Sequence, residues 1–162
     1  MSKEYWKPGN MLYPVPAVMV SCGREGETPD IITVAWAGTI CSDPAMVSIS
    51  VRKERFSHSI IRDTGEFVIN LVNKRLVRAT DYCGVKSGRD VDKFKETRLT
   101  PQASRYVKAP GVEESPVNIE CKVVEVKELG SHDMFIAKVM GVTIDNRYMA
   151  VSYTHLRAHE TR

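Results

Sequence analysis

The chain has 162 residues, of which 43% are hydrophobic and 27% charged, and its formal net charge is +3. These values suit one globular domain with a core of ordinary size and exclude disordered, collagen-like and coiled-coil classes. The basic excess is too small to indicate nucleic-acid binding by itself, because proteins that bind the phosphate backbone concentrate more positive charge on one face.

The cysteine pattern indicates reduced thiols. No CxxC or paired spacing joins the four cysteines, which argues against a zinc ribbon and against a secreted disulfide framework; they are Cys22, Cys41, Cys83 and Cys121. No basic segment followed by an apolar run opens the chain, and no stretch approaches the roughly 20 apolar residues needed to cross a bilayer. We therefore expect a cytoplasmic protein without a membrane partner.

The first third of the chain predicts an irregular arm followed by three strands. Residues 1–14 have no clear period, and the strands are expected at residues 15–22, 31–38 and 46–51. The second strand has apolar residues on both faces, whereas the third has serines on one face only. Between them, Cys41 to Pro44 is expected to be a bend, because Pro44 disfavours the helical region for the residue before it.

A short helix and a fourth strand follow. Ser57 is a favoured N-cap residue, and Gly65 is placed to end that helix before a strand over residues 66–72. A second helix is expected over residues 73–84, where Gly84 would close it and where one apolar face would be formed by Leu76, Ala79 and Cys83.

Residues 85–116 are charged and broken by Gly and Pro, which predicts a long excursion with one helical turn near residues 90–95. Residues 117–129 and 134–145 then predict two long strands joined by a tight hairpin turn. A change of phase at Val123 and Val124 indicates a β-bulge, which would help the sheet curl. Because strands and helices do not alternate, we predict a mainly β fold, an antiparallel barrel with short helices.

The last residues differ from the rest. From residue 150 the sequence AVSYTHLRAHETR drops the strand pattern and is typical of translated sequencing-adapter DNA. We therefore expect one domain over residues 1–149 and a non-native tail over residues 150–162. His155 and His159 have the i, i+4 spacing of a metal pair, but they lack the HExxH pattern and lie in this tail, so no metal site is predicted.

A first group of candidate site residues lies on the second predicted strand and its exit: Thr33, Trp36, Thr39, Cys41 and Ser42. Alternation along a strand would turn several of these side chains toward one concave surface. Trp36 could pack against a planar ring. The same residues also fit a plain strand followed by an Asp-Pro turn, so the pattern alone leaves both interpretations open.

A second group combines hydroxyls with fixed cations just before the predicted helix: Ser48, Ser50, Arg52, Lys53, Arg55, Ser57 and His58. Free N–H groups at a helix start and bidentate arginines both favour phosphate. The alternative is a solvated basic loop, and neither a P-loop nor a GxGxxG motif is present. Lys86, Arg89 and Lys93 form a further basic run, and His132 lies at the tip of the predicted hairpin.

Five motifs occur in an order that resembles a known family: IITVAWAGTICSDP, VSISVR, GEFVIN, TDYCGVKSGRDVDKF and LGSHDMFIA. From about Tyr13 to Tyr148 the chain resembles the flavin reductase-like proteins with an FMN-binding split barrel, and among them most closely the flavoredoxins. The resemblance implies an antiparallel split β-barrel and a homodimer that holds one noncovalent FMN per subunit.

The resemblance also assigns roles to individual residues. It implies that the isoalloxazine ring is surrounded by Thr33, Trp36, Thr39, Cys41 and Ser42, and that His132 approaches this ring. It implies that the ribityl phosphate is held by Ser50, Arg52, Ser57 and Lys93. Family members cover the flavin with a segment after the last strand, where this chain carries the unusual tail.

Two activities fit this resemblance: an electron carrier that exchanges electrons with a partner protein, and an NAD(P)H-dependent flavin reductase. No nicotinamide signature separates them. Two further classes stay open. A small β-barrel can bind single-stranded nucleic acid, although the aromatic residues here do not interleave with the basic ones. The chain could also be a flavin-free interaction module.

Overall fold

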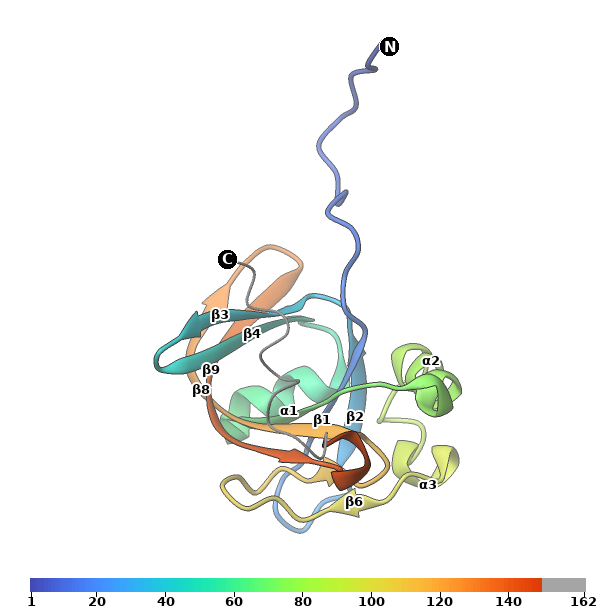
Figure 1. Cartoon of the computed structure of the whole chain (residues 1–162), viewed down its shortest axis with the longest axis vertical. Coiled ribbons are helices and arrows are strands. Elements are labelled where there is room, and N and C mark those ends of the chain that lie inside the picture. The colour runs from blue at the N-terminus through green and yellow to red at the C-terminus, as the bar shows by residue number, and fades with distance from the viewer. Residues whose placement is uncertain (150–162) are drawn as a thin grey trace.

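The computed structural model describes residues 1–149, which form one curled sheet with short helices around it (Figure 1). The strands are β1 (Val18–Cys22), β2 (Asp30–Val34), β3 (Ala37–Ser42), β4 (Ala45–Arg52), β5 (Glu66–Asn70), β6 (Pro101–Gln102), β7 (Gly111–Val112), β8 (Val117–Glu128) and β9 (His132–Ile144). The helices are α1 (Phe56–Thr64), α2 (Val77–Val85) and α3 (Lys93–Thr97), with 3-10 turns η1 (Lys74–Leu76) and η2 (Asn146–Tyr148).

Seven strands form the main sheet in the order β2-β1-β5-β8-β9-β4-β3, and every neighbouring pair is antiparallel. The edge strands β2 and β3 are not hydrogen-bonded to each other, so the curled sheet is a split barrel. Its inner core joins residues from both ends of the strand order, including Ile32 and Val34 of β2 and Val47 and Ile49 of β4. The predicted antiparallel barrel is confirmed.

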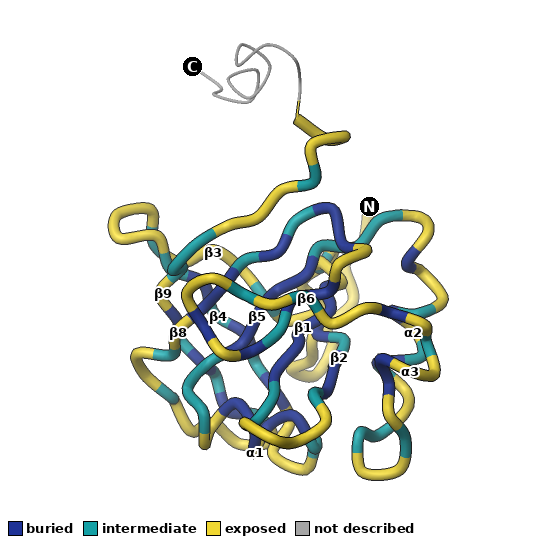
Figure 2. The backbone as a smooth tube through the Cα atoms, turned by 90° about the horizontal axis from the view of Figure 1, so that it is seen from below, coloured by how far each residue is buried: buried dark blue, intermediate teal, exposed yellow. Residues whose placement is uncertain are grey.

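Strand β1 is buried on both faces, as Figure 2 shows for the centre of the molecule. Val18, Val20 and Cys22 point to the inner core. Met19 points to the other face, where it packs in a second cluster with Leu76 and with residues from α2 and α3. The prediction that β2 is also buried on both faces is confirmed, since Ile31 joins this second cluster. The two short helices thus cover the outside of the barrel next to β1 and β2.

Two predictions about the first strands need correction. The strand expected over residues 31–38 breaks at Ala35 and Trp36, and the chain continues as the separate strand β3. The Ser50 N–H donates to the Trp36 carbonyl at 2.9 Å, which fixes this corner against β4. Cys41 is not part of a bend, because β3 includes it and the turn contains only Asp43 and Pro44. A tight hairpin therefore replaces the long bend that the proline indicated.

Helix α1 packs against β1, β2 and β5, with Ile60 and Ile61 in the inner core. Gly65 ends it in the left-handed region with φ of 67°, as predicted, since glycine adopts that conformation without steric cost. Ser57 is not the N-cap. Arg55 occupies that position and Ser57 lies inside the first turn, where Asp30 binds its hydroxyl.

The second predicted helix forms as η1 and α2, with Leu76 and Cys83 buried as expected. Gly84 does not end it, because the helix continues through Val85 and Gly84 instead lets α2 approach β2. A Cβ at this position would lie 3.3 Å from the Thr33 Cβ. The excursion over residues 85–116 is more structured than predicted, since α3 starts at Lys93 and β6 pairs with β7.

The C-terminal hairpin is confirmed, with β8 and β9 paired along most of their length. The register shifts between Val123 and Glu125, where the bulge was predicted, and again between Glu120 and Cys121. These bulges let the long strands bend around the core. The hairpin turn brings His132 opposite Arg52, the last residue of β4.

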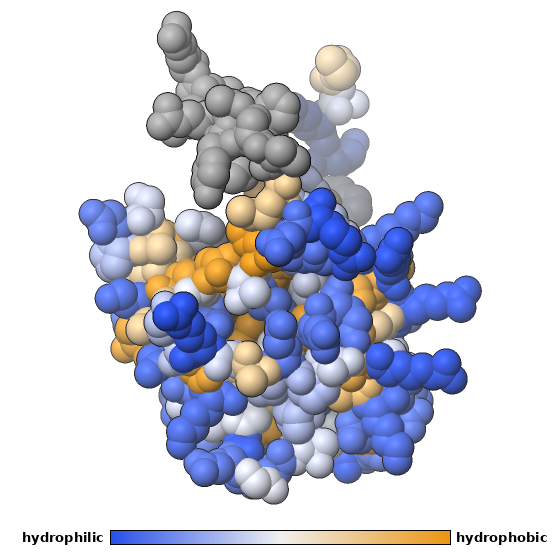
Figure 3. Space-filling model, turned by 60° about the horizontal axis from the view of Figure 1, so that its bottom comes forward, coloured by the Kyte–Doolittle hydropathy of each residue, from blue (hydrophilic) through white to orange (hydrophobic). Residues whose placement is uncertain are grey.

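The arm over residues 1–14 leaves the body of the molecule and is almost fully exposed (Figure 1). Hydrophilic side chains project from most of the face seen in Figure 3, and an apolar band lies between them. Within the described residues no helix is both long enough and apolar enough to span a membrane. The predicted tail over residues 150–162, with its two histidines, lies outside the described residues.

Candidate functional site

Two neighbouring hollows lie where β2, the end of β4 and the start of α1 meet. The first, which we call the cationic hollow, has a volume of about 390 Å³ and is lined by Ile32, Arg52, Glu54, Arg55, Phe56, Ser57, Lys86, Ser87, Gly88, Arg89 and Lys93. The second, the aromatic hollow, has a volume of about 170 Å³ and is lined by Ile32, Thr33, Val34, Ala35, Trp36, Ser50, Val51, Arg52, Arg55 and His132. Three residues belong to both, so the hollows adjoin: Ile32, Arg52 and Arg55.

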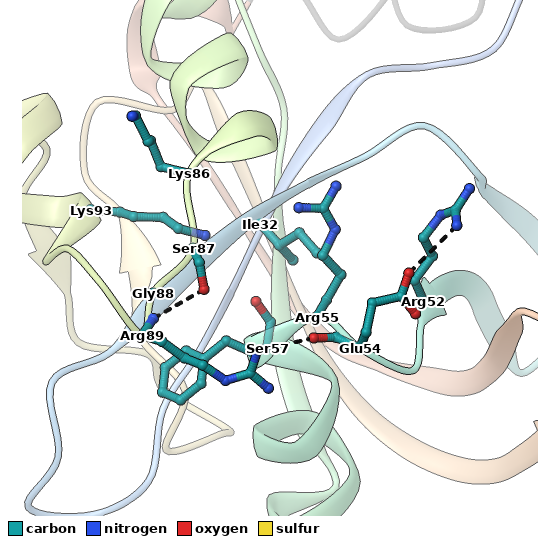
Figure 4. Close-up of a pocket in the computed structure, with 11 residues that line it drawn as sticks. Ile32, Arg52, Glu54, Arg55, Ser57, Lys86, Ser87, Gly88, Arg89 and Lys93 are labelled. Carbon is teal, nitrogen blue, oxygen red and sulfur yellow. Dashed lines mark hydrogen bonds and ion pairs between the residues drawn. The ribbon is translucent and has the colours of Figure 1, made fainter.

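Two segments supply the basic side chains of the cationic hollow from opposite sides (Figure 4). Arg52 and Arg55 come from the turn between β4 and α1. Lys86 and Arg89 come from the segment between α2 and α3. The Arg89 guanidinium donates to the Glu54 carbonyl at 3.2 Å, which links the two sides across the hollow.

Much of this positive charge is free to meet an anion. Arg52 forms only a long, exposed ion pair with Glu54 at 3.5 Å, and exposed pairs of this kind contribute little free energy. Helix α1 also begins at this hollow, and no side chain among the described residues caps its first turn. Uncapped helix starts present N–H groups and partial positive charge, so this wall of the hollow suits a phosphate.

The floor of the cationic hollow is a buried ion pair. Asp30 Oδ1 lies 3.1 Å from Lys93 Nζ, in ion-pair contact although not aligned as a hydrogen bond. The Ser57 hydroxyl donates to the other carboxylate oxygen, Asp30 Oδ2. Because both charged groups are almost fully buried, each depends on the other for compensation of its charge.

Flat side chains dominate the aromatic hollow. Trp36 and His132 lie with their ring centroids 4.5 Å apart and their planes tilted by 36°. Burial lowers the pKa of His132, and the positive charge of Arg52 lowers it further. The imidazole is therefore mostly neutral at pH 7 and can contact an uncharged ring.

A second buried carboxylate, Asp133, follows His132 in the chain. Asp133 is fully buried and contacts His58 at 2.8 Å and Lys53 at 3.3 Å. Burial alone would raise the pKa of Asp133, but the hydrogen bond with His58 and the positive charge of Lys53 outweigh it and hold the pKa below its ordinary value. The carboxylate thereby ties the β4–α1 turn to the hairpin that carries His132.

The structure brings most of the predicted site residues together. The cationic hollow contains Arg52, Ser57 and Lys93, and the aromatic hollow contains Thr33, Trp36, Ser50, Arg52 and His132. Thr33 takes part mainly as structure, because its hydroxyl donates to the Thr80 carbonyl of α2. The two groups of candidates thus meet at one site, although they come from distant parts of the chain.

Three predicted residues do not join the others within this chain. Thr39, Cys41 and Ser42 lie on β3 beside the start of β4, and none of them lines either hollow. Arg52 is at the other end of β4, five to seven residues from their partners on that strand, so steps of about 3.3 Å give separations of roughly 17–23 Å. The corner at Trp36 directs β3 away from the site.

Seven residues that line the cationic hollow were not assigned to the ligand from the sequence: Glu54, Arg55, Phe56, Lys86, Ser87, Gly88 and Arg89. Arg55 stood out as a cation next to a helix start, and Lys86 and Arg89 as part of a further basic run. Their place opposite each other could not be predicted, because it depends on how the segment after α2 folds back.

The thiols do not offer nucleophilic chemistry at this site. All four cysteines are free. Burial raises the pKa of Cys83 to about 11 and of Cys121 to about 12, and it raises the pKa of Cys22 as well. Reactive cysteines need a lowered pKa, so these three side chains are packing residues. Over residues 1–149, no group of three or more His, Cys, Asp or Glu side chains could hold a metal ion.

The donors and charges of the two hollows fit a ligand with a phosphate at one end and a planar ring at the other. The cationic hollow offers arginines and an uncapped helix start, whereas the aromatic hollow offers flat faces and hydroxyls. Phosphate esters of ring-containing cofactors have this combination of parts.

Comparisons with known proteins identify the fold and the family. Residues 10–159 match the model of the flavin reductase like domain. The structure is similar to a flavoredoxin of Desulfovibrio vulgaris, with 33% identity, a TM-score of 0.85 and coverage of 93% of this chain and 80% of that one. It also resembles an FMN-binding protein from Thermus thermophilus, with 21% identity, a TM-score of 0.80 and coverage of 92% and 84%.

A sequence relative gives the same result. An uncharacterised protein of Pyrococcus abyssi is 32% identical over 133 residues, which cover 82% of this chain and 76% of the relative. The split barrel and the family predicted from the sequence are therefore confirmed. The chain belongs to the flavin reductase-like family of flavin-binding split-barrel proteins.

Proposed function

We propose that the chain binds FMN noncovalently and carries electrons through it. The observation that carries this proposal is the pairing of an uncapped α1 start, next to Arg52 and Arg55, with the Trp36 and His132 rings in the adjoining hollow. The phosphate would lie in the cationic hollow and the isoalloxazine ring along the aromatic one. The similarly folded protein from Thermus thermophilus is an FMN-binding protein, which supports the same cofactor.

The proposed phosphate site would give a preference for FMN over riboflavin, which lacks the phosphate. Arg52 and Arg55 would bind the phosphate oxygens from the α1 side, while Lys86 and Arg89 would face them from the opposite segment. Bidentate arginines and helix-start N–H groups both bind a phosphate more strongly than neutral donors do. Lys86 and Arg89, which form part of a basic run in the sequence, would thus contribute to the phosphate site.

A bound flavin supplies hydride or single-electron transfer, which no side chain of this chain could perform alone. The residues would bind and orient it. Trp36 and His132 would fix the plane of the ring, and the neutral state of His132 avoids placing a full positive charge against it. Ile32 lies between the two hollows and would exclude water where the ribityl chain passes.

We further propose a cytoplasmic homodimer. β3 is an edge strand of the sheet, and Ile40 at its centre is 49% exposed. An exposed edge strand with apolar side chains tends to pair with another chain. A second copy on this edge would also give Thr39, Cys41 and Ser42 a place near a ring, which they lack in the single chain. Light scattering after size exclusion would test this arrangement, and a monomer at all concentrations would contradict it.

The experiment for the main proposal is a titration of the purified protein with FMN and, separately, with riboflavin, followed by flavin fluorescence and absorbance. We expect FMN to bind more tightly than riboflavin. A protein that acquires no flavin absorbance after incubation with excess FMN would refute the proposal.

Addition of NADH or NADPH to the FMN complex separates the two activities. An electron carrier that depends on a partner protein keeps its oxidised spectrum, whereas a flavin reductase bleaches rapidly. We propose the carrier, which agrees with the flavoredoxin similarity. Rapid bleaching by either nucleotide would replace it with the reductase activity.

A further inference from the structure

Beneath the cationic hollow, Asp30 and Lys93 form an ion pair in which the residues are only 2% and 3% exposed. Lys93 lines the hollow and is the first residue of α3, so its charge could be expected to bind a phosphate directly. The hydrogen bonds of this buried pair point to a different role.

The Lys93 ammonium is already engaged within the protein. Nζ donates to the Ile31 carbonyl at 2.6 Å and to the Cys83 carbonyl at 3.4 Å, and it forms an ion pair with the Asp30 carboxylate at 3.1 Å. Two hydrogen bonds and one buried counter-charge thus hold an ammonium group that has three N–H bonds. Lys93 therefore joins β2 to the end of α2 and the start of α3, and its charge is already compensated.

The Ser57 hydroxyl is also already engaged with Asp30. This hydroxyl has one proton, which it donates to Asp30 Oδ2, and the side chain is buried. A hydroxyl engaged in this way presents only lone pairs to the hollow and has no proton to donate to a phosphate oxygen. The carboxylate thus occupies the donors of two residues that line the hollow.

The carboxylate also supports the opposite wall. Gly88 packs so closely that a Cβ there would lie 2.4 Å from Asp30 Oδ1 and 2.6 Å from Phe56 Cδ1. Gly88 lies between Lys86 and Arg89, so the position of these cations depends on a segment that rests on Asp30. The buried Asp30 side chain on β2 thereby contacts α1, α3 and the segment over residues 86–89.

We propose that Asp30 and Lys93 form an electrically neutral floor that positions the phosphate-binding residues without touching the phosphate. Asp30 is the positioning residue, and Lys93 balances its charge. The phosphate is then recognised by the cations above this floor: Arg52, Arg55, Lys86 and Arg89. This inference rests on the proposed function, because it concerns how the FMN phosphate is held.

The test uses the preference for FMN over riboflavin, measured as the ratio of the two dissociation constants, in four proteins. These are the native chain, Lys93→Met, the double variant Asp30→Asn/Lys93→Met, and Arg55→Ala as the reference for a direct phosphate contact. Met preserves the length of the lysine side chain, and Asn preserves an acceptor for Ser57. Thermal unfolding of each protein verifies that it is folded at the assay temperature.

We expect Lys93→Met to lower the preference for FMN by about tenfold, because it leaves the Asp30 charge uncompensated beneath the phosphate. The double variant removes both charges and should return the preference to within about twofold of the native value. This rescue is the decisive result. If the single variant does not fold, the double variant alone decides, since it should match the native chain and not Arg55→Ala.

Two results would overturn the inference. If the double variant loses as much preference as Arg55→Ala, Lys93 is a direct phosphate ligand. If affinity for riboflavin and FMN falls equally in Lys93→Met, the pair has only a general structural role. A native chain that binds neither flavin would instead refute the proposed function itself.

Discussion

The two halves of the site differ in how the chain supports them. The cationic hollow lies between two segments that rest on the buried Asp30 carboxylate, and it is the larger of the two, at about 390 Å³. The aromatic hollow is about 170 Å³, and Trp36, its largest side chain, is 43% exposed. Within one chain the cationic hollow is larger and has buried support, whereas the aromatic hollow is smaller and its tryptophan is partly exposed. Affinity should therefore depend more on the phosphate contacts than on the ring contacts.

Arg55→Ala gives the largest expected effect on binding. A hydrogen bond to a charged group contributes about 1.5–3 kcal/mol, so the affinity for FMN should fall by about tenfold or more. The affinity for riboflavin should fall less than that for FMN, because Trp36 and His132 remain, although Arg55 also lines the aromatic hollow. Fluorescence titration measures both, and Arg78→Ala, on the exposed surface of α2, is the matched control. An equal loss for both flavins would contradict the division of the site into two halves.

The same substitution at two glycines compares the cationic hollow with a strand outside the site. At Gly88 an added Cβ would lie 2.4 Å from the Asp30 carboxylate, whereas at Gly38, on β3, it would meet nothing within 4 Å. We expect Gly88→Ala to reduce the free energy of unfolding by about 1–3 kcal/mol and to weaken FMN binding as the 86–89 segment moves. Gly38→Ala should change stability by less than about 0.5 kcal/mol. Urea unfolding measures both, and equal effects would show that Gly88 is not tightly packed.

The unequal support of the two halves also explains which parts of the site the sequence predicts. Arg52 and Ser50 come from one strand and precede a helix start, and such local patterns mark an anion site from the sequence alone. Alternation and turn residues likewise predict β4, the Gly65 helix end and the bulged C-terminal hairpin. These features depend on residues near one another in the chain.

The sequence fails where distant segments decide the outcome. The corner at Trp36 separates β2 from β3, and no proline or glycine lies there to indicate it. Ser57 has the chemistry of an N-cap, but the buried Asp30 carboxylate takes its hydroxyl. Lys93 likewise has the chemistry of a phosphate ligand, but its buried ammonium contacts Asp30 and the carbonyls of Ile31 and Cys83. Tertiary hydrogen bonds thus change what a residue does without changing its type.

Trp36→Ala tests the ring half and should have a smaller effect than Arg55→Ala. Aromatic contacts contribute about 0.5–1.5 kcal/mol beyond area burial, so affinity should fall by about three- to tenfold. The loss should be equal for FMN and riboflavin, since Trp36 lies in the aromatic hollow and not in the cationic one. Trp36→Phe is the conservative control and should recover part of the affinity. A loss confined to FMN would place the phosphate, and not the ring, next to Trp36.

The smallest expected effect comes from a change at Arg52, which lines both hollows. The pKa of His132 is lowered first by burial and then by the charge of Arg52. Arg52→Ala should therefore raise this pKa toward its ordinary value but leave it below that value, because burial remains. Nuclear magnetic resonance titration of the imidazole in the flavin-free protein measures the change, with Arg78→Ala as the control.

The lowered pKa of His132 also predicts how the free energy of unfolding changes with pH. A histidine with a lowered pKa binds its proton more weakly in the folded chain than in the unfolded one, so folding is favoured above the unfolded pKa of about 6.5. The native protein should lose this contribution as the pH falls through the pKa of folded His132, and Arg52→Ala should lose less of it. A pKa unchanged by Arg52→Ala would mean that solvent screens the two side chains from each other. The cationic and aromatic halves would then act independently.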